Sequence, residues 1–215
     1  MRLHSILLAL ALSSLSAFSA FSADVKYQND FQKSELDSLP DDLMRLEGEF
    51  VVKEENGNKF LELPGAPLDT FAVLFGPNAK ENVAVSARIF GIGSGRKLPA
   101  FDVGLNGVGG YKLRVSPAKR ALELYRGDAQ KTTVPLKWES GKWTHLKLQV
   151  LKSGEKEWKV EGKYWQEGSQ EPVEPTLKFV ETDAPPSGRA SVSGMPFSGT
   201  PIRFDDLVVS EARQK

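Results

Sequence analysis

Alternation of apolar and polar residues, broken at short intervals by turn residues, is the feature that most constrains the fold of this chain. From residue 44 onward almost every stretch reads at period two and is rich in β-branched and aromatic residues. The Asn56-Gly57 pair between two apolar runs predicts a tight hairpin. About a dozen short strands follow one another at regular spacing, with no helical stripe among them. This pattern predicts an all-β sandwich or barrel.

The first 23 residues have the organisation of a secretory signal peptide. Met1-Arg2 is a short positive lead, Ser5 to Leu15 is an apolar run, and small residues follow. The apolar run is too short to span a bilayer, which needs about 20 residues. We expect cleavage before Asp24 or one residue earlier. Residues 24–215 are then a single domain, exported to the periplasm or the extracellular space without membrane insertion.

The composition excludes several classes of function. The chain has no cysteine, which removes thiol nucleophiles, iron–sulfur clusters and thiolate zinc sites. Its 28 basic and 28 acidic residues balance, so nothing indicates a nucleic acid or a charged membrane surface as partner.

Three short motifs resemble one known superfamily. Residues 141–148 read G-x-W-x-x-L-x-L, residues 202–209 contain an Asp-Asp pair between apolar residues, and residues 29–31 read Asn-Asp-Phe. These motifs are similar to strands of the concanavalin A-like lectin/glucanase superfamily, in particular its laminin G-like jelly rolls in bacterial exported proteins. The resemblance covers nearly all of residues 24–215 and implies a two-sheet antiparallel β-sandwich. The superfamily includes lectins, glycan hydrolases, lyases and modules that only bind.

The same resemblance implies a structural calcium ion. Many members of the superfamily hold one calcium between the last strand and the first, and Asp206, Asp30 and Asp205 occupy the matching positions. Carboxylate oxygens suit that ion. The alternative is that Asp205 and Asp206 end a loop or form hydrogen bonds at the start of a strand.

Motifs for catalysis are incomplete. The family 16 glycosidases of this fold carry Glu-x-Asp-x-x-Glu on one strand, and two stretches here, beginning at Glu35 and at Glu181, start this motif without completing it. His145 is the only histidine after the leader, and by alternation it faces outward from its strand. We therefore expect no catalytic residues of these kinds.

Side chains opposite the core-facing ones are the candidates for ligand binding. Glycans bind by stacking on aromatic rings while a few polar groups fix their hydroxyls. We expect the strands that carry the first four candidates to lie side by side, and Trp165 lies on a further outward row. The candidates are Arg88, Asp102, Arg114, Tyr125 and Trp165. A solvated sheet face with cross-strand charge pairs would show the same pattern, and the sequence does not say which face is concave.

Three functions fit this pattern. The first is an exported, non-catalytic module that binds a glycan or attaches to an extracytoplasmic protein. The second is a glycoside hydrolase or polysaccharide lyase whose acid and base lie on different strands. The third is a structural or protein-interaction domain, and fold analogy does not choose among them.

Overall fold

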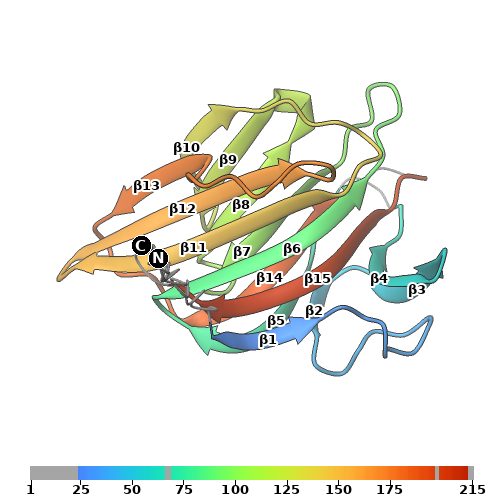
Figure 1. The fold of residues 1–215 in the computed structure, drawn as a ribbon, viewed down its shortest axis with the longest axis horizontal. Helices are drawn as coiled ribbons and strands as arrows, with labels where there is room; N and C mark the ends of the chain where they lie inside the picture. Colours follow the sequence, from blue (N-terminus) through green and yellow to red (C-terminus); the bar gives the residue numbers. More distant parts are fainter. Residues whose placement is uncertain (1–23, 66–68, 197–198, 213–215) are drawn as a thin grey trace, which may run out of the picture.

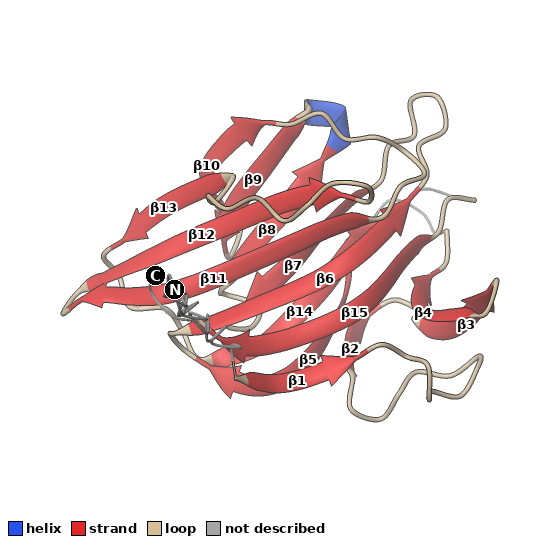
Figure 2. Cartoon of the chain, viewed as in Figure 1, coloured by secondary structure: helices blue, strands red, loops and turns tan. Residues whose placement is uncertain are grey.

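The computed structural model describes residues 24–65, 69–196 and 199–212, and the predicted signal peptide lies outside this part of the chain. Figure 2 shows that strands dominate it, with one short 3₁₀ helix, η1 (Pro117–Lys119). The strands are β1 (Val25–Asn29), β2 (Met44–Glu47), β3 (Val51–Glu55), β4 (Asn58–Leu63), β5 (Phe71–Ala79), β6 (Val83–Gly91), β7 (Ala100–Leu105), β8 (Tyr111–Ser116), β9 (Ala121–Arg126), β10 (Ala129–Pro135), β11 (Thr144–Gly154), β12 (Glu157–Gln166), β13 (Leu177–Glu181), β14 (Gly188–Met195) and β15 (Ile202–Glu211).

Within the described residues the strands form two antiparallel sheets that pack face to face (Figure 1). Sheet A has eight strands in the order β13-β12-β11-β6-β15-β4-β3, with β1 also paired to β15. Sheet B has seven strands in the order β10-β9-β8-β7-β14-β5-β2. The predicted all-β, two-sheet sandwich is therefore confirmed. No helix in the described part of the chain is long and apolar enough to cross a membrane.

Turn residues set the register of the hairpins as the sequence predicts. Asn56 and Gly57 both have positive φ, 54° and 78°, and they join β3 to β4. Two consecutive residues of this kind form the mirror-image turn whose twist matches that of paired strands. Arg126 and Ala129 pair across the Gly127-Asp128 turn, so that the tripeptide Arg-Gly-Asp is a hairpin tip.

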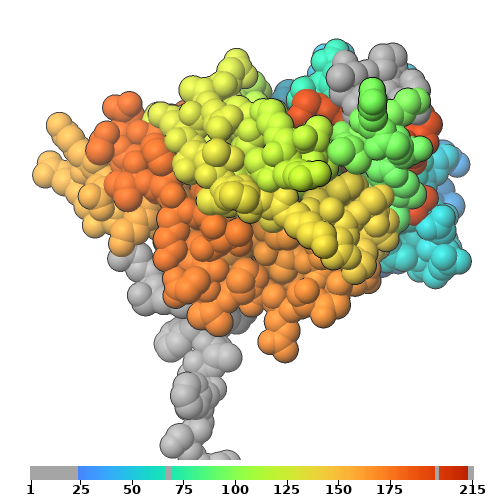
Figure 3. Space-filling view, turned by 90° about the horizontal axis from the view of Figure 1, so that it is seen from above, coloured from blue at the N-terminus to red at the C-terminus, as the bar shows by residue number. Residues whose placement is uncertain are grey.

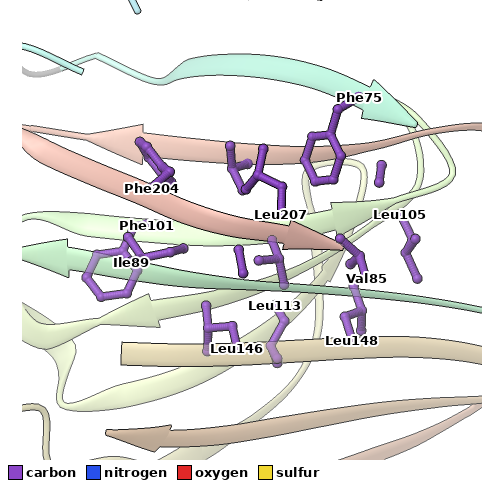
Figure 4. Packing of buried hydrophobic residues seen from close by; sticks show 14 of the residues in the cluster. Phe75, Val85, Ile89, Phe101, Leu105, Leu113, Leu146, Leu148, Phe204 and Leu207 are labelled. Atoms are coloured by element: carbon purple, nitrogen blue, oxygen red, sulfur yellow. The ribbon is translucent and has the colours of Figure 1, made fainter. Parts of the chain in front are cut away.

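The hydrophobic core lies between the two sheets and is built from the inward residues of the alternation. Val85 and Ile89 of β6 meet Leu146 and Leu148 of β11 in one layer, and all four side chains are fully buried (Figure 4). Phe101 in sheet B is buried in the facing layer. Because every second residue of a strand enters this core, the remaining residues must form the two outer faces of the sandwich.

One buried carboxylate links the two sheets at the edge of the sandwich. Glu181, at the end of β13 in sheet A, is buried, and its Oε2 lies 2.8 Å from Arg126 Nη1 and 3.4 Å from Lys131 Nζ in sheet B. The Tyr111 hydroxyl donates to the same oxygen at 3.4 Å. Burial raises the pKa of Glu181, but bonds from Arg126 and from the Asp183 backbone outweigh it and keep the pKa below its usual value. Glu181 therefore joins the sheets as a carboxylate.

Candidate ligand-binding faces

The five predicted ligand residues lie on both outer faces of the sandwich. Asp102 in β7, Arg114 in β8 and Tyr125 in β9 come together on the outer face of sheet B. Arg88 in β6 and Trp165 in β12 lie on the outer face of sheet A. The expectation that Arg88 lies beside the first three is wrong, because the chain crosses to the other sheet between β6 and β7.

The cluster on sheet B is held by one buried ion pair. Asp102 lies opposite Arg114 in the ladder, and both Nε and Nη2 of Arg114 approach Asp102 Oδ2 at 2.9 Å. The Arg114 guanidinium also stacks over the Tyr125 ring, with its carbon 5.0 Å from the ring centroid. Asp102 Oδ1 is buried and has no hydrogen-bond partner among the described residues. A buried carboxylate oxygen without a donor is costly, so this atom is a candidate acceptor for a ligand hydroxyl.

A second carboxylate lies two strands away from Asp102 in the same row. Glu123 in β9 is opposite Arg114, is buried, and accepts hydrogen bonds from the Ser116 hydroxyl and from Lys119 Nζ. Burial alone raises the pKa of Glu123, but these two bonds outweigh it and the pKa lies below its usual value. Lys119 also reaches the Tyr125 hydroxyl at 3.4 Å. The face thus presents cations and an aromatic ring above buried acids.

Sequence reasoning missed the strand that completes this face. Ser191 and Ser193 of β14 lie opposite Gly104 and Asp102 of β7, so two short hydroxyl side chains adjoin the cluster. Both serines are buried at 7% and 3% exposure, although they point away from the core. The alternation of small polar with apolar residues over 190–194 was the available signal. Its position in the sheet was hidden because β14 lies far along the chain from β7.

On sheet A, Arg88 is the centre of a cluster that ties three strands together. Its Nη2 donates to Asp205 Oδ2 in β15 at 2.6 Å and to Asn58 Oδ1 in β4 at 3.2 Å, and its Nε lies 2.8 Å from Asp206 Oδ2. The Asp205 side chain is fully buried. Burial raises the pKa of Asp205 above its usual value despite the hydrogen bond from Asn58 and the charge of Arg88.

The calcium prediction rests on Asp30, Asp205 and Asp206, and the arrangement of these three carboxylates does not fit the ion. Asp205 and Asp206 occupy a bulge of β15, where Asp206 has a φ of 50°, and the guanidinium of Arg88 lies between their carboxylates. Asp30 lies in the turn after β1 and accepts a bond from the Gln32 backbone. No group of three or more acids and histidines in the described ranges is arranged to hold a metal. The positive charge at this position comes from an arginine.

Aromatic rings extend this cluster along the end of sheet A. Arg88 lies over Trp143 at 4.7 Å, and Arg203 lies over Phe60 and Phe90 at 4.5 and 5.5 Å.

One strand further across sheet A, His145 stacks on Trp165 with ring centroids 5.0 Å apart and an interplanar angle of 7°. Burial, and then the charge of Arg88, lower the pKa of His145 below its ordinary 6.5.

Comparison with known proteins supports the fold and no closer relationship. No protein-family model matches the chain, and no curated protein sequence matches it. A Bacillus subtilis protein of unknown function with a galectin-like fold superposes with a TM-score of 0.60 at 13% identity, over 89% of this chain and 98% of that one. The carbohydrate-binding module CBM66 from Bacillus subtilis gives 0.54 at 11% identity, over 79% and 96%. The fold is concanavalin A-like.

Concanavalin A-like sandwiches with this shape include an enzyme as well. The marine PL-14 alginate lyase from Aplysia kurodai superposes with a TM-score of 0.57 at 10% identity, over 88% of this chain and 100% of that one. Because both a binding module and a lyase have the fold, the function must be argued from the side chains of this chain.

Proposed function

We propose that the protein is exported and binds a carbohydrate, without catalysis, through the outer face of sheet B. The observation that carries this proposal is the cluster of Asp102, Arg114 and Tyr125 on three adjacent strands. The proposal is also supported by the carbohydrate-binding module among the solved structures that share this fold.

The chemistry of the cluster suits a sugar ring. Arg114 uses Nε and Nη2 on one oxygen of Asp102, which leaves the donors of its Nη1 for ligand hydroxyls. Asp102 Oδ1 is an acceptor without a donor, and Ser193, opposite Asp102 in the ladder, adds a hydroxyl to the same face. The partly exposed ring of Tyr125 offers an apolar surface next to these polar groups. Ligand sites in general combine an apolar wall with a few polar groups in this way.

The two acids of this face are poor candidates for an acid–base pair, which disfavours the hydrolase or lyase alternative. A general acid at neutral pH needs a pKa raised above its usual value. The pKa of Glu123 is instead lowered, because the bonds from Ser116 and Lys119 outweigh burial. Asp102 is held in an ion pair by the guanidinium of Arg114, which occupies its Oδ2. Both groups are suited to hold cations in place and to accept hydrogen bonds.

Retention on affinity gels that contain neutral polysaccharides tests the proposal. The variant Y125A removes the ring and its contact with Arg114 but leaves both partners of the Asp102–Arg114 ion pair in place. We expect it to weaken retention about tenfold, as the loss of one stacking contact with the sugar would. W165A removes an aromatic side chain of similar exposure from the other sheet and serves as the matched control. It should be retained like the natural protein.

Other outcomes would replace the proposal. Loss of retention in W165A but not in Y125A would move the site to sheet A. Release of sugar or of unsaturated ends from any polysaccharide would establish the enzyme alternative. Recovery of one consistent protein partner, with no polysaccharide retained, would establish the interaction domain.

A further inference from the structure

The longest connection within a sheet lies over the outer face of sheet A and encloses a hollow. Hairpin loops ordinarily have about two to five residues, yet residues 167–176 join the adjacent strands β12 and β13. This segment, here called the strap, folds back over β11 and β12, and the orange surface of this region projects from one side of the molecule, away from the yellow-green surface of β8–β10 (Figure 3). Its length exceeds what the turn requires.

The hollow has a volume of about 270 Å³ and a floor rich in lysine. Lys147 and Lys163 lie directly opposite each other in the β11–β12 ladder. Like charges at opposed positions repel, so this pair is unfavourable unless an anion lies between them. Lys159 and Lys178 line the same hollow, and Lys159 makes no ion pair among the described residues.

Glu171 of the strap supplies the anion. Its Oε1 lies 2.8 Å from Lys163 Nζ and 3.2 Å from Lys147 Nζ, so one carboxylate oxygen serves both lysines. The Glu171 side chain is 39% exposed, and partly exposed pairs of this kind contribute about 0–1 kcal/mol. Val173, two residues further along the strap, is 80% exposed at the rim of the hollow. The ends of the strap are fixed by hydrogen bonds of Glu167 and Thr176, whereas its contact with the two lysines is weak and exchangeable.

We propose that the hollow is a second glycan site, specific for a uronate ring, in which Glu171 occupies the place of the ligand's carboxylate until the ligand displaces it. The volume is near the lower limit of small-molecule pockets and suits one sugar ring. Gln149 and Glu161, which hydrogen-bond at 2.7 Å on the same floor, offer a donor and acceptors for hydroxyls beside the carboxylate. The site lies on the opposite sheet from the Asp102 cluster and does not depend on it.

Titration with alginate oligosaccharides tests this site, with neutral dextran oligosaccharides as the comparison ligand. We expect K163Q to weaken alginate binding about tenfold, the loss of one charge-assisted hydrogen bond, and E171Q to strengthen it several-fold by removing the internal competitor. K53Q and E155Q change the same charges at positions outside the hollow and control for net charge. They should leave the affinity within twofold of the natural protein.

Two results would overturn the proposal. The first is an affinity of E171Q equal to or below that of E155Q, since a displaced competitor must raise affinity beyond the charge effect. The second is alginate binding that K163Q keeps and Y125A loses, because that pattern assigns the uronate to the outer face of sheet B. Failure of neutral-glycan binding in Y125A tests only the sheet B site, so the two proposals fail separately.

Discussion

Replacing Arg88 by methionine isolates the energetic role of the most buried ion pair on sheet A. The Asp205 carboxylate beneath it is fully buried, and Arg88 Nη2 is 2.6 Å from its Oδ2. Removing one partner of a buried pair leaves an unpaired charge and costs about 3–5 kcal/mol. Because the Arg88 side chain is itself 24% exposed, we expect R88M to cost about 3 kcal/mol, the lower end of that range. For a domain of this size the melting temperature should fall by about 6–12 °C.

Arg203 offers a matched control on the neighbouring strand. It also stacks on aromatic rings, but its strongest partner, Glu55, is 55% exposed. R203M should therefore lose the cation–π contacts with Phe60 and Phe90 and the ion pairs with Glu55 and Glu62, about 1–2 kcal/mol in total. Urea unfolding followed by tryptophan fluorescence measures both variants. The midpoint should shift while the slope with denaturant stays constant, since neither change alters the surface exposed on unfolding.

The cost of R88M should also depend on pH, with a sign that follows from Asp205. Burial already raises the pKa of Asp205, and loss of Arg88 must raise it further. A carboxyl whose folded pKa is raised destabilises the fold above that pKa and ceases to do so once it is protonated. The deficit of R88M relative to the natural protein should therefore shrink as the pH falls from 7 toward 4. The reasoning is refuted if R88M costs no more than R203M, or if its deficit grows at low pH.

Two further results are expected. His145 has a lowered pKa because burial and Arg88 disfavour its charged form, so the unfolded chain binds the proton first and stability falls as the pH drops below 6.5. H145Q should lose less stability than the natural protein between pH 7.5 and pH 5.5, and parallel urea midpoints for the two would contradict this assignment. Chelator should leave the melting temperature unchanged, because Arg88 supplies the cation for Asp205 and Asp206. A fall of several degrees on adding EDTA, reversed by calcium, would show that the ion binds there after all.

Period-two alternation predicts most of the fold because burial of every second residue is a local property of a strand. The inward side of β6, at Val83, Val85, Ala87 and Ile89, is buried as the alternation requires. The Asn56-Gly57 turn likewise depends only on residues near it in the sequence. Signals of this kind need no knowledge of the partner strand.

The sheet that a strand joins is not a local property of its sequence. For that reason the five predicted ligand residues lie on two different sheets. β6 and β7 follow each other with the same alternation, yet they belong to opposite sheets. Loop length does not decide the matter, since three residues connect β5 to β6 across the sheets while ten connect β12 to β13 within one. Arg88 and Asp102 therefore have the same outward pattern in sequence, and only the pairing of distant strands separates them.

The ion pairs Arg88–Asp205 and Arg114–Asp102 differ in a way that distinguishes a structural role from a binding role. Each places a buried carboxylate beneath a partly exposed arginine on an outer face. Both oxygens of Asp205 are used, because Oδ1 accepts from the Asp206 backbone and Oδ2 from Arg88 and Asn58.

Asp102 differs from Asp205 in the bonding of one carboxylate oxygen, because Arg114 donates only to Oδ2 and Oδ1 has no donor. A buried acceptor in this condition costs about 1–3 kcal/mol, whereas a carboxylate with both oxygens bonded, such as that of Asp205, needs no further donor. The Asp205 carboxylate is therefore complete within the fold, although Arg88 Nε faces Asp206 in an ion pair without a hydrogen bond, and Asp102 is the carboxylate whose hydrogen bonding a ligand hydroxyl would complete.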